Sequence, residues 1–191
     1  LGFAPHNLLL QSSDLETTWA GAGITITTGV SDPFGGATAF KLAAAATSNA
    51  LSQSVVVKAG TIYTTSVYLQ NVDATTSRLY FWDNTGVDSQ ADLVIAWTAG
   101  VPSTSSSNAA SAITYTDVGD NWYRASFYGT SDAANTSHKM FIYPSSTVAA
   151  GSVNVYGPQW NEGSVLLPYN ATTTSAYQGP RFEHGGIYRN L

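Results

Sequence analysis

The sequence predicts an all-β protein, a two-sheet antiparallel β-sandwich of the jelly-roll type. Short segments rich in Val, Ile, Thr, Tyr and Phe recur about every ten residues, and clusters of Gly, Asn, Asp and Ser separate them. No window of twelve or more residues has the 3.6-residue apolar period of a helix. Many strands without intervening helices favour an antiparallel sandwich, and an up-and-down barrel is the alternative.

The predicted strands define one domain. They span residues 7–10, 24–28, 38–42, 51–57, 62–69, 78–82, 93–97, 112–117, 122–128, 139–143 and 152–160. Two polar stretches, residues 98–111 and 132–137, are predicted to be exposed loops; the first contains Pro102 and a serine-rich tract and is predicted to be the longest and most mobile. We expect the jelly-roll domain to cover residues 1–170 and an extended C-terminal arm or linker to follow over residues 171–191.

Composition excludes several classes of partner. The 191 residues carry a net charge of −5 with only 7 Lys and Arg, too few for the basic surface that nucleic-acid binding requires. No apolar run reaches the roughly 18–20 residues of a membrane span, so no membrane insertion is expected. Cysteine is absent, which excludes disulfides and thiolate metal sites. The chain begins with Leu, which indicates a processed chain or a segment of a longer protein.

Catalytic motifs are missing as well. The sequence contains no nucleophile elbow, phosphate-binding loop or metal-ligand cluster, and its three histidines are scattered singly. Its only glutamates, Glu16, Glu162 and Glu183, lie outside the central strands, where a glycosidase would place its acid and its nucleophile or base. We therefore expect no enzymatic activity.

Period-2 alternation along four predicted strands separates two sets of side chains. The first set is apolar and is predicted to form the core: Tyr63, Val67, Leu69, Leu79, Phe81, Tyr123, Ala125, Phe127, Met140 and Ile142. The second set mixes rings, hydroxyls and cations: Thr64, Ser66, Tyr68, Arg78, Tyr80, Trp82, Trp122, Arg124, Ser126, Tyr128, Lys139, Phe141 and Tyr143. If these strands are neighbours, the second set forms one half-polar aromatic face.

A face of this composition is suited to sugar binding, because a pyranose offers apolar C–H faces that stack on rings and hydroxyls that hydrogen-bond at its rim. The candidate carbohydrate-binding residues are Arg78, Tyr80, Trp82, Arg124, Tyr128 and Tyr143. The alternative for each ring is simple packing, since sandwich proteins carry aromatic side chains on both faces.

Four ordered segments resemble a known family. They are residues 7–16 (NLLLQSSDLE) with Trp19, residues 52–68 (SQSVVVKAGTIYTTSVY), residues 120–124 (DNWYR), and residues 156–164 (YGPQWNEGS) with Pro168 and Tyr169. In this order and spacing they resemble the carbohydrate-binding-module-like jelly rolls of tailed-bacteriophage structural proteins and of some polysaccharide-degrading enzymes. The resemblance covers residues 7–169. The stretch 98–111 departs from the pattern, so no sugar-contact residue is carried over by position.

The resemblance implies a non-catalytic surface module of a tailed-phage virion, a capsid decoration or a fibre or tail component, with glycan adhesion as its activity. Its partners would be a glycan or polysaccharide and other virion subunits, and it would act as a homo-oligomer or in many copies on the particle surface. One alternative is a carbohydrate-binding module of a secreted polysaccharide-degrading enzyme. A second alternative is a purely structural protein whose aromatic face is a protein interface.

The resemblance also bears on metal binding and on the end of the chain. No cofactor is expected, but jelly rolls of this type often carry a structural calcium near the first and last strands, where Asp14, Glu16 and Glu162 lie. A second group of oxygen ligands is Asp83, Asn84, Asp88 and Asp92. Neither group follows the EF-hand pattern, and solvated turn carboxylates are the alternative. Residues 179–184 (GPRFEH) resemble a segment that connects such domains to the rest of a phage particle; a disordered end is the alternative.

Overall fold

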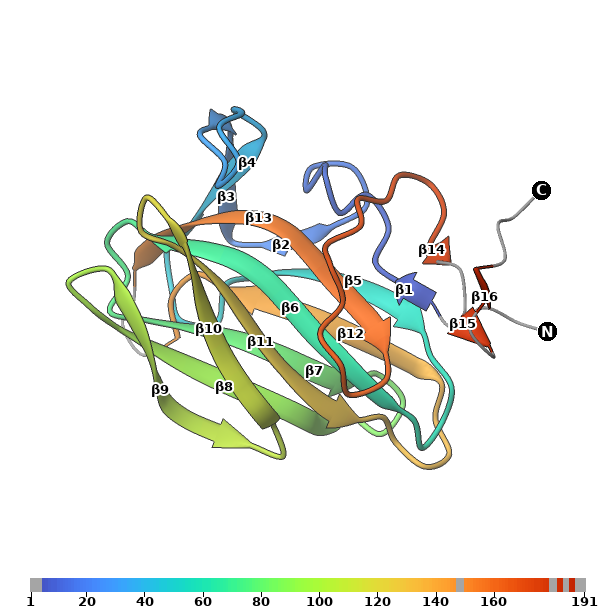
Figure 1. Ribbon diagram of the computed structural model, residues 1–191. Helices are drawn as coiled ribbons and strands as arrows, with labels where there is room; N and C mark the ends of the chain where they lie inside the picture. Colours follow the sequence, from blue (N-terminus) through green and yellow to red (C-terminus); the bar gives the residue numbers. More distant parts are fainter. Residues whose placement is uncertain (1–4, 147–149, 179–181, 184–185, 188–191) are drawn as a thin grey trace.

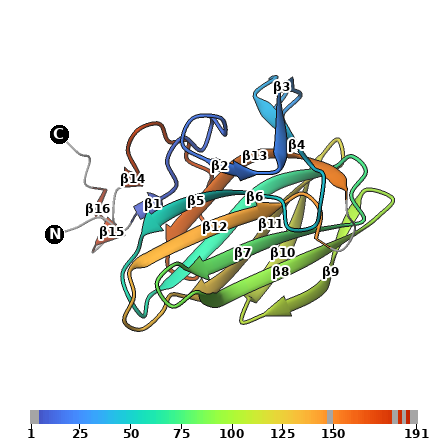
Figure 2. The ribbon, with the colours of Figure 1, turned by 180° about the vertical axis from the view of Figure 1, so that it is seen from behind.

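Two six-stranded antiparallel sheets pack face to face in the computed structural model, which describes residues 5–146, 150–178, 182–183 and 186–187 (Figure 1). The front sheet of Figure 1 has the strand order β10-β11-β6-β13-β4-β3, and the back sheet, seen from its own side in Figure 2, has the order β2-β5-β12-β7-β8-β9. The chain crosses between the sheets repeatedly, and the predicted jelly-roll sandwich is confirmed.

The strands are, in chain order, β1 (Pro5–Asn7), β2 (Ala20–Ala22), β3 (Ile24–Val30), β4 (Ala39–Ala44), β5 (Ala50–Val56), β6 (Ile62–Asn71), β7 (Thr76–Asp83), β8 (Asp88–Thr98), β9 (Val101–Asn108), β10 (Ser111–Gly119), β11 (Trp122–Thr130), β12 (Ser137–Tyr143), β13 (Gly151–Glu162), β14 (Tyr177–Gln178), β15 (Phe182–Glu183) and β16 (Gly186–Ile187). Every predicted strand overlaps one of these. Within the described part of the chain, no helix is long and apolar enough to span a lipid bilayer.

The prediction of a long mobile loop over residues 98–111 is wrong, because most of this stretch forms β9. Ala99 and Gly100, both with positive φ, make a two-residue turn that pairs Thr98 with Val101 and returns the chain alongside β8. Strand β9 is the edge of the back sheet, and nearly all of its side chains are exposed. An edge strand that buries almost nothing needs no apolar alternation, so its serine-rich sequence lacks the signal of a strand.

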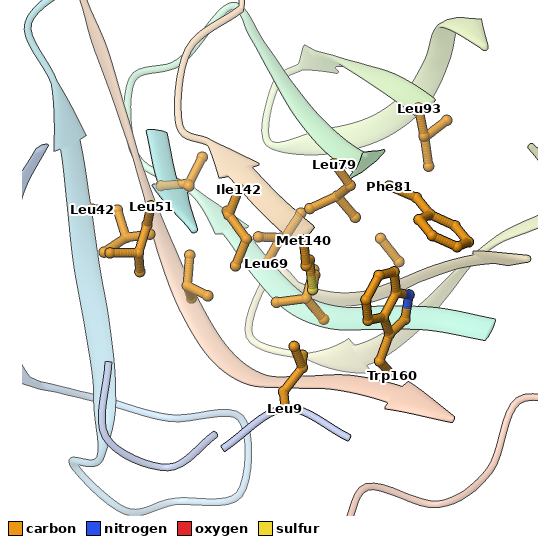
Figure 3. Packing of buried hydrophobic residues seen from close by; sticks show 14 of the residues in the cluster. Leu9, Leu42, Leu51, Leu69, Leu79, Phe81, Leu93, Met140, Ile142 and Trp160 are labelled. Carbon is orange, nitrogen blue, oxygen red and sulfur yellow. The ribbon is translucent and has the colours of Figure 1, made fainter. Parts of the chain in front are cut away.

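The core lies between the sheets and consists of the inward side chains of both (Figure 3). The predicted core residues are at most 1% exposed, except Tyr123, which is half-buried and packs against the cluster. Trp160 of β13 was not in the predicted set, yet it is fully buried and its ring lies 4.6 Å from that of Phe81, edge to face. This close packing fixes which side of each strand faces outward.

The beginning and end of the described chain are joined at one end of the sandwich (Figure 1). Strand β1 pairs with β14, and the buried Asn7 side chain donates to the carbonyl oxygens of Pro158 and Asn170. Thr172 is buried as well, and its hydroxyl contacts Leu9 O and Ser12 Oγ. Residues 171–178, predicted to begin an extended arm, therefore contact the sandwich, while the predicted domain boundary itself stays a prediction.

The predicted connecting segment 179–184 falls mostly outside the described residues. Only Phe182 and Glu183 of it are described, and they pair with Gly186 and Ile187 as a two-stranded ribbon, β15 with β16.

Candidate functional site

The structure divides the mixed set of ring, hydroxyl and cationic side chains between two opposite surfaces. Strands β6 and β11 are neighbours in the front sheet, and β7 and β12 are neighbours in the back sheet. The alternate residues of all four strands belong to the shared core, so the mixed sets point outward on opposite sides of the sandwich. The prediction of one mixed face required these four strands to be neighbours, and it is therefore wrong. Arg78, Tyr80, Trp82 and Tyr143 lie on one sheet, and Arg124 and Tyr128 lie on the other.

Four aromatic side chains gather on the outer face of the back sheet, and we call them the ring platform: Tyr80, Trp82, Phe141 and Tyr143. The ring of Tyr80 is central, with its centroid 5.3 Å from that of Trp82, 6.2 Å from Phe141 and 6.4 Å from Tyr143. Phe141 and Tyr143 stack at 5.7 Å with an interplanar angle of 29°. All four rings are half-buried, so each keeps part of its surface in solvent. Antiparallel register places Tyr80 opposite Phe141, which holds the rings on rigid strands.

An ion pair borders the ring platform. The Arg78 guanidinium carbon lies 4.0 Å from the Tyr80 ring centroid, a cation–π contact, and Arg78 Nη2 donates to Asp92 Oδ2 at 2.8 Å. Asp92 stands opposite Tyr80 on the neighbouring strand β8. Burial raises the pKa of the Tyr143 hydroxyl, and the nearby Arg78 charge acts in the opposite direction. The platform thus has polar groups at its rim that lie beside exposed ring surface.

A cavity of about 280 Å³ adjoins the platform on the same sheet. It is lined by residues of β5 and β12 on one side, and by residues of β2 and the segment before it on the other. These residues are Leu10, Thr18, Ala20, Ser52, Gln53, Ser54 and Lys139. Lys139 stands opposite Trp82 in the sheet and approaches the Phe141 ring at 5.4 Å. Lys139, Phe141 and Asp92 were not among the candidate carbohydrate-binding residues, although alternation had placed Lys139 and Phe141 in the mixed set with the other rings.

Part of the outer face of the front sheet is covered by residues 163–173, which we call the strap (Figure 1). Figure 1 shows the chain returning across this sheet after β13, on its way to β14. Arg124 lies beneath the strap, 8% exposed, and its Nη2 donates to Ser66 Oγ at 3.0 Å and to Leu167 O at 2.8 Å. Burial lowers the pKa of this guanidinium. Arg124 therefore holds the strap in place, and it is too buried to meet a ligand at the surface.

Aromatic side chains on this front face pack against the strap. Burial raises the pKa of the Tyr169 hydroxyl to about 12, and a hydrogen bond with Ser12 acts in the opposite direction. The Tyr169 ring lies against Gly157, where φ is +56° and a Cβ would come within 2.9 Å of the ring, so only glycine fits. Tyr128 lies apart from this cluster, half-buried in the lining of a cavity of about 320 Å³ with Thr64 and Leu166.

The three candidate calcium ligands do not form one site. Glu162 Oε2 accepts a hydrogen bond from Lys58 Nζ at 2.8 Å, and Asp14 accepts hydrogen bonds from Glu16 N and Thr17 Oγ1 within its own turn. Over the described ranges, no three His, Asp or Glu side chains gather closely enough to hold a metal ion. Asp14 is thus held within its own turn, and Glu162 at the end of β13 is in an ion pair.

The second oxygen-ligand group is also divided among separate contacts. Asp83 accepts hydrogen bonds from Asn135 Nδ2, Thr85 N and Gly86 N, and these lower its pKa although burial acts to raise it. Asp92 is in the ion pair with Arg78. The buried His138 nearby accepts from Asp132 N at 3.2 Å, and burial lowers its pKa, as expected for a structural histidine.

Comparison with known proteins finds a similarity of structure alone. No protein-family model matches the chain, and no curated protein sequence matches it significantly. The carbohydrate-binding and catalytic modules of Clostridium thermocellum xylanase 10B, in complex with xylohexaose, give a TM-score of 0.51 at 12% identity over 89% of this chain and 30% of that one. The fold is that of a carbohydrate-binding-module-like β-sandwich.

Two further solved structures have lower TM-scores. A carbohydrate-binding module of Cellvibrio mixtus lichenase 5A, in complex with cellotriose, gives a TM-score of 0.47 at 16% identity over 85% of this chain and 99% of the module. The enzymatically active domain of tailspike protein 4 from bacteriophage CBA120 gives 0.48 at 14% identity over 82% of this chain. The aligned region makes up only 21% of that tailspike chain, so this carbohydrate-binding-module-like sandwich spans a small part of the phage protein that it matches.

Proposed function

We propose that this sandwich is a non-catalytic glycan-binding module whose ligand lies across the ring platform of the back sheet. The observation that carries the proposal is the gathering of four half-exposed rings on two adjacent strands, with the Arg78–Asp92 ion pair at their rim. Sugar C–H faces stack on such rings, and the rim groups are placed to hydrogen-bond sugar hydroxyls. The carbohydrate-binding-module-like fold agrees with this assignment.

The absence of catalysis is part of the proposal. Glycoside hydrolysis requires two carboxyl groups on either side of the scissile bond. The outward side chains of β7 and β12 at positions 78–82 and 139–143 include no carboxylate, and Asp92 beside them is in the ion pair with Arg78. We therefore assign binding, and no bond cleavage, to this face.

The sequence motifs of residues 7–169 support a proposal for the larger assembly to which the module belongs. We propose that the module is displayed in many copies on the virion of a tailed phage, where weak contacts to a glycan would add up through avidity. A module attached to a secreted polysaccharide-degrading enzyme is the alternative. The domain next to this one in the complete gene distinguishes the two, because an enzyme-borne module would stand beside a catalytic domain.

A binding screen of the chain against immobilised glycans and polysaccharides tests the proposed activity. Trp82→Ala is expected to weaken binding at least tenfold while the protein stays folded, because it removes an exposed stacking surface and no core contact. Tyr128→Ala, which truncates a half-buried ring on the opposite sheet, is the matched control and should bind normally.

Two results would reject the proposal. Binding that is lost in Tyr128→Ala and kept in Trp82→Ala would place the site on the front sheet. A folded protein that binds no glycan and self-associates through the platform, with the association reduced by Trp82→Ala in light scattering, would favour the structural alternative in which the rings contact a neighbouring subunit.

A further inference from the structure

The cavity beside the ring platform contains a cation with no acidic partner. Lys139 forms no ion pair with any described residue, and its ammonium group contacts the Phe141 ring at 5.4 Å. Among the described residues that line the cavity, none carries a carboxylate. The other described cation on this face, Arg78, is already paired with Asp92. Lys139 therefore offers a positive charge that the protein itself does not neutralise.

The wall of the cavity is held in place by the Gln53 side chain. Its Oε1 accepts from Leu10 N at 2.6 Å, and its Nε2 donates to Leu10 O at 2.8 Å and to Thr18 Oγ1 at 3.0 Å. Gln53 is only 5% exposed, so its amide is committed to the wall and does not compete for a ligand. The cavity is thus a fixed feature that does not depend on a ligand to form it.

The cavity offers a ligand a charged donor group beside a neutral one. Ser54 stands opposite Lys139 in the sheet, and its hydroxyl oxygen accepts from Asn84 Nδ2 at 3.4 Å, which leaves its own hydrogen to donate. Together with the three donors of the Lys139 ammonium, this produces a donor-rich cavity next to the stacking surface. An ammonium without an acidic partner, next to a hydroxyl that is free to donate, matches an anion, which accepts hydrogen bonds from both groups.

We infer that the module recognises an acidic sugar, whose carboxylate or sulfate group enters the cavity at Lys139 while a neighbouring pyranose stacks on the ring platform. This inference rests on the proposed function and names its ligand class. The whole chain carries a net charge of −5, which repels an anion at long range, so the recognition depends on this local contact. Lys139 is half-buried as a residue, and a charge held against the protein surface is less screened by water than one in bulk solvent.

A glycan array that contains uronic acid, sulfated and neutral glycans tests the inference. We expect the bound members to be acidic, and the share of carboxylated and sulfated hits tells which anion is preferred. For the tightest ligand, Lys139→Gln should raise Kd at least tenfold, and Lys139→Arg should keep most of the affinity. Methyl esterification or desulfation of the glycan should reproduce the loss in the unaltered protein.

Lys41→Gln is the matched control, because it removes an equal charge from β4 in the front sheet and should leave Kd unchanged. If the bound glycans are neutral and Lys139→Gln binds them normally, while Trp82→Ala does not, the acidic ligand class is rejected and the proposed function stands. If no glycan binds, or if Trp82→Ala has no effect on those that do, the proposed function fails and this inference fails with it.

Discussion

The two outer faces of the sandwich have similar side chains, but the cluster on one face is covered and the cluster on the other is partly exposed. Each combines tyrosines, a tryptophan and an arginine, as the alternation of the sequence shows. On the front sheet, the strap covers the cluster and Arg124 donates to the backbone of the strap. On the back sheet, the ring platform stays half-exposed and Arg78 pairs with a side chain of its own sheet. What separates a packing surface from a candidate binding surface is therefore the course of residues 163–173, which strand periodicity does not report.

The largest expected effect sets the scale for both faces. Phe81→Ala should lower the free energy of unfolding by about 3–5 kcal/mol, because it empties a core position against Trp160. Trp82→Ala, on the next residue but on the outer side of β7, should cost about 1 kcal/mol or less. Urea unfolding monitored by circular dichroism measures both. Equal losses would mean that the inner and outer sides of β7 are assigned incorrectly.

Tyr169 on the covered face and Tyr143 on the ring platform should contribute differently to stability and to binding. Tyr169→Ala should lower the free energy of unfolding by about 2–3 kcal/mol, because this strap residue packs its ring onto the front sheet against Tyr68, Tyr156 and Gly157. Tyr143→Ala on the ring platform should cost about 1 kcal/mol and should reduce glycan binding, which Tyr169→Ala should spare wherever the protein remains folded. Thermal unfolding and the binding screen provide the two measurements. A smaller loss of stability in Tyr169→Ala than in Tyr143→Ala would contradict the conclusion that the strap covers a packed face.

Alkaline pH should destabilise the covered face through the same residue. The pKa of Tyr169 is raised from its ordinary value of 10.0 to about 12, so the unfolded chain loses this proton first. The stabilisation of the folded state that comes from the protonated Tyr169 hydroxyl is complete below pH 10 and is lost as the pH rises toward 12. The unfolding midpoint, followed between pH 9 and pH 12, should fall less in Tyr169→Phe, which has no hydroxyl to ionise. Identical slopes for the two proteins would contradict the burial of this hydroxyl.

The smallest effect is expected where the strap begins. Glu162→Gln should change the free energy of unfolding by no more than about 0.5 kcal/mol, because its partner Lys58 is 66% exposed and solvent screens the pair. Added calcium should leave the melting temperature unchanged in both the unaltered protein and this variant. A calcium-dependent rise that disappears in Glu162→Gln would show that Glu162 ligates the ion after all.

Strand periodicity predicted the sandwich and the core well, because burial on one side of a strand leaves a period-2 pattern in the sequence. It missed β9, which buries only Pro102 and carries no such pattern. Four of the six candidate carbohydrate-binding residues lie together on the back sheet, and their role stays a prediction. The assignment of β6 and β7 to different sheets depends on long-range pairing, which periodicity does not report. The contacts of Arg124 with Leu167 and of Glu162 with Lys58 were not predictable for a related reason, since these partners are distant in sequence.

The contacts of Asn7 and Thr172, which join the two ends of the sandwich domain, affect the order in which the protein folds. Asn7 reaches residues 158 and 170, and Thr172 reaches Leu9, so the first strand finds its partners more than 150 positions away. During synthesis, the N-terminal segment leaves the ribosome long before these partners exist, and it must wait while the strands between them pair. Contacts of such high sequence separation slow folding. We expect the last step of folding to be the docking of both ends, which makes this pole of the molecule the latest to become resistant to proteolysis.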